Sequence, residues 1–185
     1  MALWIVLAVV AVVVLWGIWA YNRLVNLRNQ VANGWRQIDV QLKRRYDLIP
    51  NLVNAVRGYM KYEQETLERV IQARNQALGA RSVGEAAQRE AELAGVLGRL
   101  FALLENYPEL KANQNVLQLQ EELTSTENKI AFARQFYNDV ATKYNIARET
   151  FPSNIIAKLF GFQAAELFAV ADEREREVPQ VNLGW

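Results

Sequence analysis

The sequence predicts an all-α protein with a single N-terminal transmembrane helix, an antiparallel up-and-down four-helix bundle and a C-terminal amphipathic segment. Three observations predict this class. The first twenty residues carry no charged side chain. Apolar residues then recur every three or four positions, which is the spacing of one helix face. Only 4 prolines and 9 glycines occur among the 185 residues, which fits long helices better than a sheet with many turns.

The transmembrane helix is predicted at residues 1–21. About twenty apolar residues are needed to cross the roughly 30 Å hydrocarbon core of a bilayer, and this stretch supplies them. Trp16, Trp19 and Tyr21 cluster at its far end, as in an interfacial aromatic belt. A cleaved signal peptide is the rival interpretation, but it requires early basic residues and a small-residue cleavage site. We therefore expect a retained anchor.

The charges on either side of this helix predict its orientation. Only the terminal amine precedes it, whereas Arg23, Arg28 and Arg36 follow it. Flanking segments rich in Lys and Arg stay on the cytoplasmic side of a membrane. We expect the N-terminus outside and the rest of the chain in the cytoplasm.

The composition excludes several classes of function. The net charge is +1, so the basic excess that nucleic-acid binding requires is missing. The chain has no Cys and no His, which excludes disulfides, zinc sites built on these residues, and Ser-His-Asp or Cys-His catalysis. Carboxylates such as Glu63, Glu90 and Glu127 could bind a divalent ion if they faced inward, but they could equally pair with arginines at helix flanks. We expect no enzyme activity, cofactor, metal or nucleic acid.

The bundle is predicted over residues 22–150, from four apolar stripes at residues 24–42, 49–78, 86–107 and 116–151. Ser82 followed by Glu85 has the pattern of a capping box before the third stripe. The fourth stripe alternates steps of three and four, as in a coiled coil. Its members are Val116, Leu119, Leu123, Thr126, Ile130, Ala133, Tyr137, Val140, Tyr144, Ala147 and Phe151. One helix cannot bury its own stripe, so we expect four packed helices.

The segment KRRYDLIP, residues 43–50, lies between the first two stripes. Pro50 inside a helix would remove one hydrogen bond and cost about 3 kcal/mol, whereas a helix that begins at Asp47 would avoid this penalty. We expect a turn near Tyr46, with a kinked helix as the alternative. The same segment offers a candidate partner surface, or else a solvated group that complements the helix dipole. This candidate surface comprises Lys43, Arg44, Arg45 and Asp47.

Residues 151–171 are predicted to form an amphipathic, membrane-proximal segment. Pro152 ends the fourth helix, and in an up-and-down bundle that helix returns to the bilayer. The segment could lie on lipid, close the end of the bundle as a lid, or contact another protein. The candidate lipid contacts are Ile155, Ile156, Leu159, Phe160, Phe162 and Phe168. Residues 172–185 are predicted to be a charged stretch followed by an extended tail.

Three blocks of the sequence resemble the LemA family of bacterial membrane proteins. They are QLKRRYDLIPNLVNAVRGYMKYE at residues 41–63, KANQNVLQLQEELTSTENKIAFARQFYNDVATKYN at residues 111–145 and TFPSNIIAKLFGF at residues 150–162. The resemblance implies one transmembrane helix and an antiparallel helical bundle in the bacterial inner membrane, with no established enzyme activity and no known cofactor. By analogy only, it adds that one relative, a magnetosome protein of magnetotactic bacteria, is associated with membrane invagination.

The function that these features predict is a non-enzymatic, membrane-anchored helical scaffold that self-assembles and organises or shapes the membrane. The alternative is an adaptor that recruits a membrane or soluble enzyme, for example a protease, through the bundle surface. The expected partners are the lipid bilayer, further copies of the chain and an unidentified protein. The heptad stripe fixes no copy number, because helices of the same chain can satisfy it.

Overall fold

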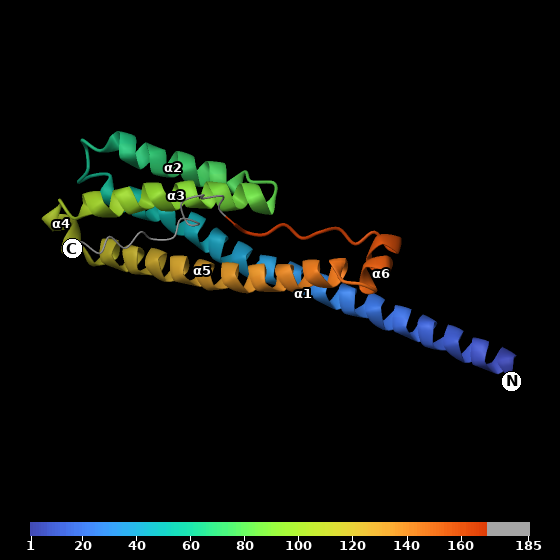
Figure 1. Cartoon of the computed structure of the whole chain (residues 1–185). Helices are drawn as coiled ribbons and strands as arrows, with labels where there is room; N and C mark the ends of the chain where they lie inside the picture. The colour runs from blue at the N-terminus through green and yellow to red at the C-terminus, as the bar shows by residue number, and fades with distance from the viewer. Residues whose placement is uncertain (170–185) are drawn as a thin grey trace, which may run out of the picture.

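The protein is described by a computed structural model in residues 1–169 (Figure 1). All the regular secondary structure in the described part is helical, without strands, so the predicted all-α class is confirmed. The helices are α1 (Ala2–Val56), α2 (Gln64–Leu78), α3 (Val83–Leu104), α4 (Pro108–Lys111), α5 (Gln114–Glu149) and α6 (Ser153–Leu159). The predicted tail at residues 172–185 and the last two residues of the predicted 151–171 segment lie outside the described residues.

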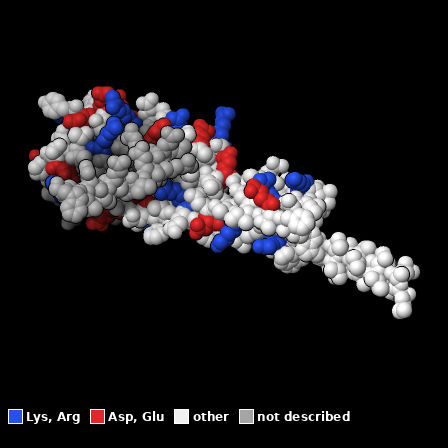
Figure 2. All heavy atoms as spheres, viewed as in Figure 1, with Lys and Arg blue, Asp and Glu red and all other residues white. Residues whose placement is uncertain are grey.

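α1 is a single helix of 55 residues, about 83 Å long at 1.5 Å per residue. Its first part projects from the body as a bare rod (Figure 1), and Figure 2 shows no charged side chain on that rod. Apolar side chains there, from Leu3 to Trp19, are largely exposed. This stretch is long and apolar enough to cross a membrane, and none of its most apolar window is buried by the rest of the chain.

α5 lies alongside α1 and runs in the opposite direction. Arg44 on α1 pairs with Glu122 in the first half of α5, at 3.5 Å. Much earlier on α1, Tyr21 contacts Phe160, which follows α5 in the chain, with ring centroids 4.8 Å apart. The helices approach closely at Gly34, where an added Cβ would lie 3.3 Å from the Cα of Tyr137. The chain therefore returns along α1 to the base of the rod.

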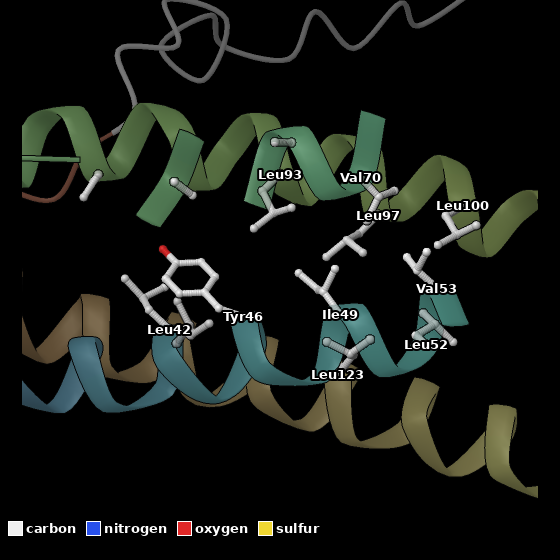
Figure 3. Packing of buried hydrophobic residues seen from close by; sticks show 14 of the residues in the cluster. Leu42, Tyr46, Ile49, Leu52, Val53, Val70, Leu93, Leu97, Leu100 and Leu123 are labelled. Carbon is white, nitrogen blue, oxygen red and sulfur yellow. The ribbon is translucent and has the colours of Figure 1, made fainter. Parts of the chain in front are cut away.

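α2 and α3 lie side by side and cover the half of α1 farthest from the N-terminus (Figure 1). Figure 3 shows Ile49 and Val53 of α1 pointing toward Val70 of α2 and Leu97 and Leu100 of α3. All of these side chains are buried. A second, smaller apolar cluster lies near the base of the rod and contains Leu24, Tyr144, Ala147, Ala157 and Phe162. The main core thus lies far from the rod, and the smaller cluster lies at the end of the body next to the rod.

The turn expected near Tyr46 is wrong, because α1 continues through Pro50 to Val56. The reversal of the chain falls instead at residues 57–63, between α1 and α2. Pro50 has no N–H, so the carbonyl of Tyr46, one turn earlier, loses its helical donor. Arg74 of α2 replaces that donor, since its Nε donates to the Tyr46 oxygen at 3.0 Å. The apolar stripe also continues across Pro50, with Ile49 and Val53 both buried.

The remaining helix ends follow the local sequence. Ser82 caps α3 by accepting a hydrogen bond from the Glu85 N–H at 3.1 Å, and Glu85 accepts one from the Arg81 N–H at 2.9 Å. This differs from the predicted capping box in one bond: Glu85 accepts from the N–H of Arg81, whereas in a capping box it would accept from the N–H of Ser82. Most of the predicted heptad stripe on α5 is buried. The exceptions are Leu119, which is half-buried, and Phe151, which is exposed.

Candidate functional site

The base of the rod is where α6 folds back onto α1. The Ser153 hydroxyl ties α6 to the end of α5, because its single proton is shared between the carbonyl oxygens of Ala147, at 2.7 Å, and Thr150, at 2.9 Å. Ala157 is buried in the smaller cluster. The Ile156 side chain lies 3.8 Å from the place where a Cβ on Gly17 would stand. α6 therefore packs against the last turns of the rod.

The outer side of this end carries exposed apolar side chains. Four of them stand at or beside α6, with exposed fractions of 55–75%. They are Phe151, Ile155, Leu159 and Phe160. Burying such groups is favourable by about 25 cal/mol per Å² of apolar area. We call these four residues the apolar collar. The collar and the exposed surface of the rod lie at the same end of the molecule.

Two of the six candidate lipid contacts are buried inside the protein. Phe162 is 6% exposed in the smaller cluster, and the guanidinium of Arg28 lies over its ring at 5.2 Å. Phe168 is 2% exposed and packs against Trp35, with ring centroids 6.1 Å apart. Neither ring reaches the outer surface, so both stabilise the fold here. Of the other four, Ile155, Leu159 and Phe160 are exposed and Ile156 is half-buried.

Cations mark the transition from the rod to the body. Arg23 lies over the ring of Trp19 at 5.5 Å, one turn beyond the exposed apolar stretch. Arg28 lies further along α1, over the ring of Phe162 in the smaller apolar cluster. Long cationic side chains at such a position cover apolar surface with their stems and keep the charge near water. The arrangement suits a boundary between lipid and water.

The predicted partner surface at residues 43–47 is divided by the fold. Lys43, Arg44 and Asp47 are exposed, whereas Arg45 is 3% exposed. Arg45 lies on the buried stripe of α1, three residues after Leu42 and four before Ile49. That spacing was visible in the sequence and would have placed Arg45 in the core rather than on the surface.

Arg45 is the centre of a buried polar cluster that joins three helices. It donates from Nη1 to Glu90 Oε2 of α3 at 2.9 Å, and its Nη2 lies 2.9 Å from Glu127 Oε2 of α5. The Tyr46 hydroxyl donates to the other oxygen of Glu90. Glu90 is 5% exposed, and Glu127 reaches the surface. Such a network fixes the register of α1, α3 and α5 relative to one another.

The environment of this cluster shifts the acidity of two of its groups. Burial raises the pKa of Glu90, and the Tyr46 hydroxyl and the Arg45 guanidinium oppose that rise. Burial, then the hydrogen bond to Glu90, raises the pKa of Tyr46. Glu63, the third carboxylate considered above, occupies the N-cap position of α2, makes no side-chain capping bond and lies outside this cluster. Within residues 1–169, no three His, Cys, Asp or Glu side chains gather as metal ligands would.

After α6, an extended segment runs back along α5. We call residues 162–168 the strap. Two tyrosine–asparagine pairs on α5, at residues 137–138 and 144–145, bind the main chain of the strap. Asn138 bonds both the N–H and the carbonyl of Phe168, at 2.8 and 3.0 Å, and Asn145 bonds both groups of Ala165, at 2.9 Å each. The sequence pattern did not predict this site, although the repeat of Tyr-Asn, at 137–138 and 144–145, was a usable signal.

Comparison with known proteins agrees with this architecture. The sequence model of the LemA family matches residues 34–183. The chain is 29% identical to Protein LemA of Metamycoplasma hominis over 164 residues, covering 88% of this chain and 72% of that protein. It is 25% identical to Magnetosome protein MamQ 2 of Paramagnetospirillum magneticum and 23% identical to Magnetosome protein MamQ of Magnetospirillum gryphiswaldense. Each of these matches covers 80% of this chain and 64% of the magnetosome protein.

None of these relatives carries the name of an enzyme. The magnetosome relatives and the apolar rod of α1 are both consistent with membrane association. The protein is therefore a membrane-associated helical protein, and because the family match spans well over half of its residues, the chain belongs to the LemA family.

Proposed function

We propose that this protein is a non-enzymatic scaffold that is anchored in the bacterial inner membrane and assembles with further copies of itself. The observation that carries the proposal is the shared position of two apolar surfaces. The exposed rod from Leu3 to Trp19 and the collar of α6 occur at the same end of the molecule. In this proposal the rod spans the bilayer and the collar rests on its surface.

The proposed orientation has the N-terminus outside and the body in the cytoplasm. Arg23 and Arg28, directly after the rod, support it through the bias of cations toward the cytoplasmic side. In the same proposal α1, α2, α3 and α5 act as one antiparallel, up-and-down bundle that stands on the membrane. The short connections between these helices support that arrangement.

Self-assembly is supported by an apolar groove between α1 and α5. Val40 and Phe136 line it, and so does Phe132, which is 73% exposed. Arg36 and Lys129 flank it. Copies that share one bilayer stand at the same height and in the same orientation, so their grooves lie level with one another. A two-fold contact would place Phe132 of each copy in the groove of the other.

The test is the mass of the full chain in lipid nanodiscs. The proposal expects particles that contain several copies, and Phe132→Glu should reduce them to single copies because it places a charge in the apolar contact. Tyr62→Glu, at a fully exposed position in the connection between α1 and α2, serves as the matched control. A wild-type protein that is monomeric at every density in the membrane would contradict self-assembly.

An adaptor is the second candidate function. The exposed cations Lys43 and Arg44 stand on α1 far from the rod, where a cytoplasmic enzyme could reach them. Within residues 1–169, the one ion pair of Arg44 is a half-exposed pair with Glu122, which holds it weakly. Charge reversal at Lys43 and Arg44 should then abolish capture of one specific protein. Unchanged capture after this double substitution would rule out this surface.

A further inference from the structure

The end of the body next to the rod carries an excess of positive charge. Residues 1–30 and 144–163 form the rod and this end of the body, and they contain four cations and one acidic residue. The cations are Arg23, Arg28, Arg148 and Lys158, and the acid is Glu149. The whole chain has 21 basic and 20 acidic residues, so the remainder has a slight acidic excess. The positive charge is therefore concentrated where the rod enters the body (Figure 2).

Two contacts fix the level of α6 along the rod. The Ile156 side chain packs at Gly17, and the ring of Phe160 lies 4.8 Å from that of Tyr21. Lys158 stands between Ile156 and Phe160 in the chain and is exposed. It therefore lies near the level of residues 17–21, where the apolar stretch ends. When the rod spans a bilayer, this is the level of the lipid headgroups.

Two guanidinium groups from helices far apart in the sequence act on the same hydroxyl, that of Tyr144. Arg28 lies over the ring of Phe162 at 5.2 Å, and the Tyr144 hydroxyl donates to the carbonyl of the next residue, Gln163, at 2.7 Å. Burial raises the pKa of Tyr144, and the charges of Arg28 and Arg148 oppose this rise. Like charges held near each other repel, and an anion bound beside both removes that cost.

The protein itself supplies little negative charge to these two arginines. Nη2 of Arg148 pairs with Glu149 at 2.8 Å, but the Glu149 side chain is 68% exposed, and such pairs are weak. Nε of Arg148 is buried without a hydrogen-bond partner in the part of the chain that the structure describes. None of the ion pairs within residues 1–169 includes Arg28. The two guanidinium groups can therefore bind an anion from outside the chain.

The Arg28 guanidinium is close enough to the bilayer to meet a headgroup. The Cα of Arg28 lies about 10 Å beyond that of Tyr21 along α1, at 1.5 Å per residue. The guanidinium, however, lies over the ring of Phe162, which packs 5.7 Å from the ring of Tyr21. The headgroups add roughly 5–7 Å to each side of the hydrocarbon core. A headgroup phosphate near Tyr21 is therefore within reach of Arg28.

We propose that Arg28 and Arg148 bind the phosphate of an acidic phospholipid. Arg23 and Lys158 add to the field that attracts such lipids to the base of the rod. The inference rests on the membrane position in the proposed function, and it names the class of lipid that the base prefers. Guanidinium groups bind phosphate through strong, charge-assisted hydrogen bonds. A zwitterionic lipid carries a cationic group beside its phosphate, whereas phosphatidylglycerol does not, so the cations favour the acidic lipid.

The test is native mass spectrometry of the full chain released from nanodiscs. The nanodiscs contain equal amounts of phosphatidylglycerol and phosphatidylcholine with the same acyl chains. The mass gives the number of protein copies and the number of lipids of each kind that stay bound. We expect the wild-type chain to retain mainly phosphatidylglycerol. Arg28→Gln with Arg148→Gln should lower this enrichment about thirtyfold, the factor for two charges of about 1 kcal/mol each near a membrane surface.

Two further variants separate the charge of the site from its packing and from the total charge. Arg28→Lys with Arg148→Lys keeps both charges and should keep most of the enrichment. Lys43→Gln with Arg134→Gln removes as many charges from the same two helices and should leave the enrichment unchanged. These two positions lie more than about 20 Å along α1 from Tyr21, well beyond the screening length of about 8 Å. Circular dichroism during heating checks that each variant is folded.

Equal retention of the two lipids by the wild-type chain would overturn the headgroup site. So would an equal loss of enrichment in the Lys43→Gln, Arg134→Gln chain, or a loss in the lysine variant as large as that in the glutamine variant. The copy number in the same spectra tests the proposed function separately. Multi-copy particles without enrichment would leave the scaffold in place and remove the lipid site. Single-copy particles at every density in the membrane that still retain phosphatidylglycerol would keep the site and overturn self-assembly.

Discussion

Arg74 Nε donates to the backbone oxygen of Tyr46 at 3.0 Å, and this oxygen is the one that Pro50 leaves without a helical donor. A side chain of α2 thus supplies the donor that the Tyr46 carbonyl of α1 lacks. With this bond, α1 continues from the rod into the body without a break. The long α1 therefore depends on a tertiary contact rather than on its local sequence.

This relationship predicts a coupled pair of substitutions. Arg74→Ala should lower the free energy of unfolding by about 1–3 kcal/mol, because the Tyr46 carbonyl becomes an unsatisfied buried acceptor. Pro50→Ala returns an N–H to that carbonyl, so Arg74→Ala should cost less in the Pro50→Ala chain. Denaturant unfolding of the four chains measures the coupling. Equal losses from Arg74→Ala in both backgrounds would show that the two residues act independently.

The neighbours Arg44 and Arg45 should respond differently to truncation. Arg45→Ala leaves Glu90 buried without its cation and should lower the free energy of unfolding by about 3–5 kcal/mol. Arg44→Ala removes an exposed pair with Glu122 and should change it by less than about 1 kcal/mol. Thermal unfolding followed by circular dichroism compares the two. Similar effects would mean that Arg45 is not part of the core.

Glu90 should make stability depend on pH. Its pKa is raised in the folded state by burial, so the folded protein holds this proton more tightly than the unfolded chain. Its contribution to stability is fully present below the unfolded pKa of about 4.3. It is lost as the pH rises through the higher folded pKa.

Glu90→Gln should therefore flatten the fall of unfolding free energy with rising pH. Glu122→Gln, which changes a more exposed carboxylate on α5, is the matched control and should leave the slope as it is. Unfolding midpoints collected from mildly acidic to neutral pH test this. A slope that survives Glu90→Gln would assign the pH dependence to another group.

Two phenylalanines in the C-terminal segment should differ in their contribution to stability, because one is buried and the other is exposed. Phe168→Ala should lower the free energy of unfolding by about 3–5 kcal/mol, because it empties a packed site beside Trp35. Phe160→Ala, on the exposed collar, should have a much smaller effect on the free energy of unfolding. Unfolding in detergent compares the two, and equal losses would contradict the difference in burial.

Local patterns were sufficient to predict much of the fold. The uncharged leader predicts the rod, and the heptad on α5 predicts its buried face from Val116 to Ala147. The capping pattern at Ser82 places the start of α3. Each of these features depends on residues within a few turns of one another, so the sequence alone carries the information.

The rest depends on contacts between distant residues. Pro50 reads as a helix breaker until Arg74, 24 residues later, is known to bond the Tyr46 carbonyl. The place of Arg45 on the apolar stripe is readable from the sequence, but its two partners, Glu90 and Glu127, come from distant helices and are not. The strap forms no helix or strand, so no periodicity reveals it. Only the repeated Tyr-Asn pair hinted that α5 holds another segment.

The central claim is that α6 rests on the bilayer that the rod crosses. The most direct measurement attaches a single fluorescent label to the full chain in vesicles that contain lipid-borne quenchers, at Leu159→Cys or at Tyr62→Cys. Tyr62 follows Val56, the end of α1, which lies about 54 Å along the helix from Ala20 at 1.5 Å per residue. The account predicts strong quenching at Leu159 and none at Tyr62. Quenching at Tyr62 without quenching at Leu159 would contradict it.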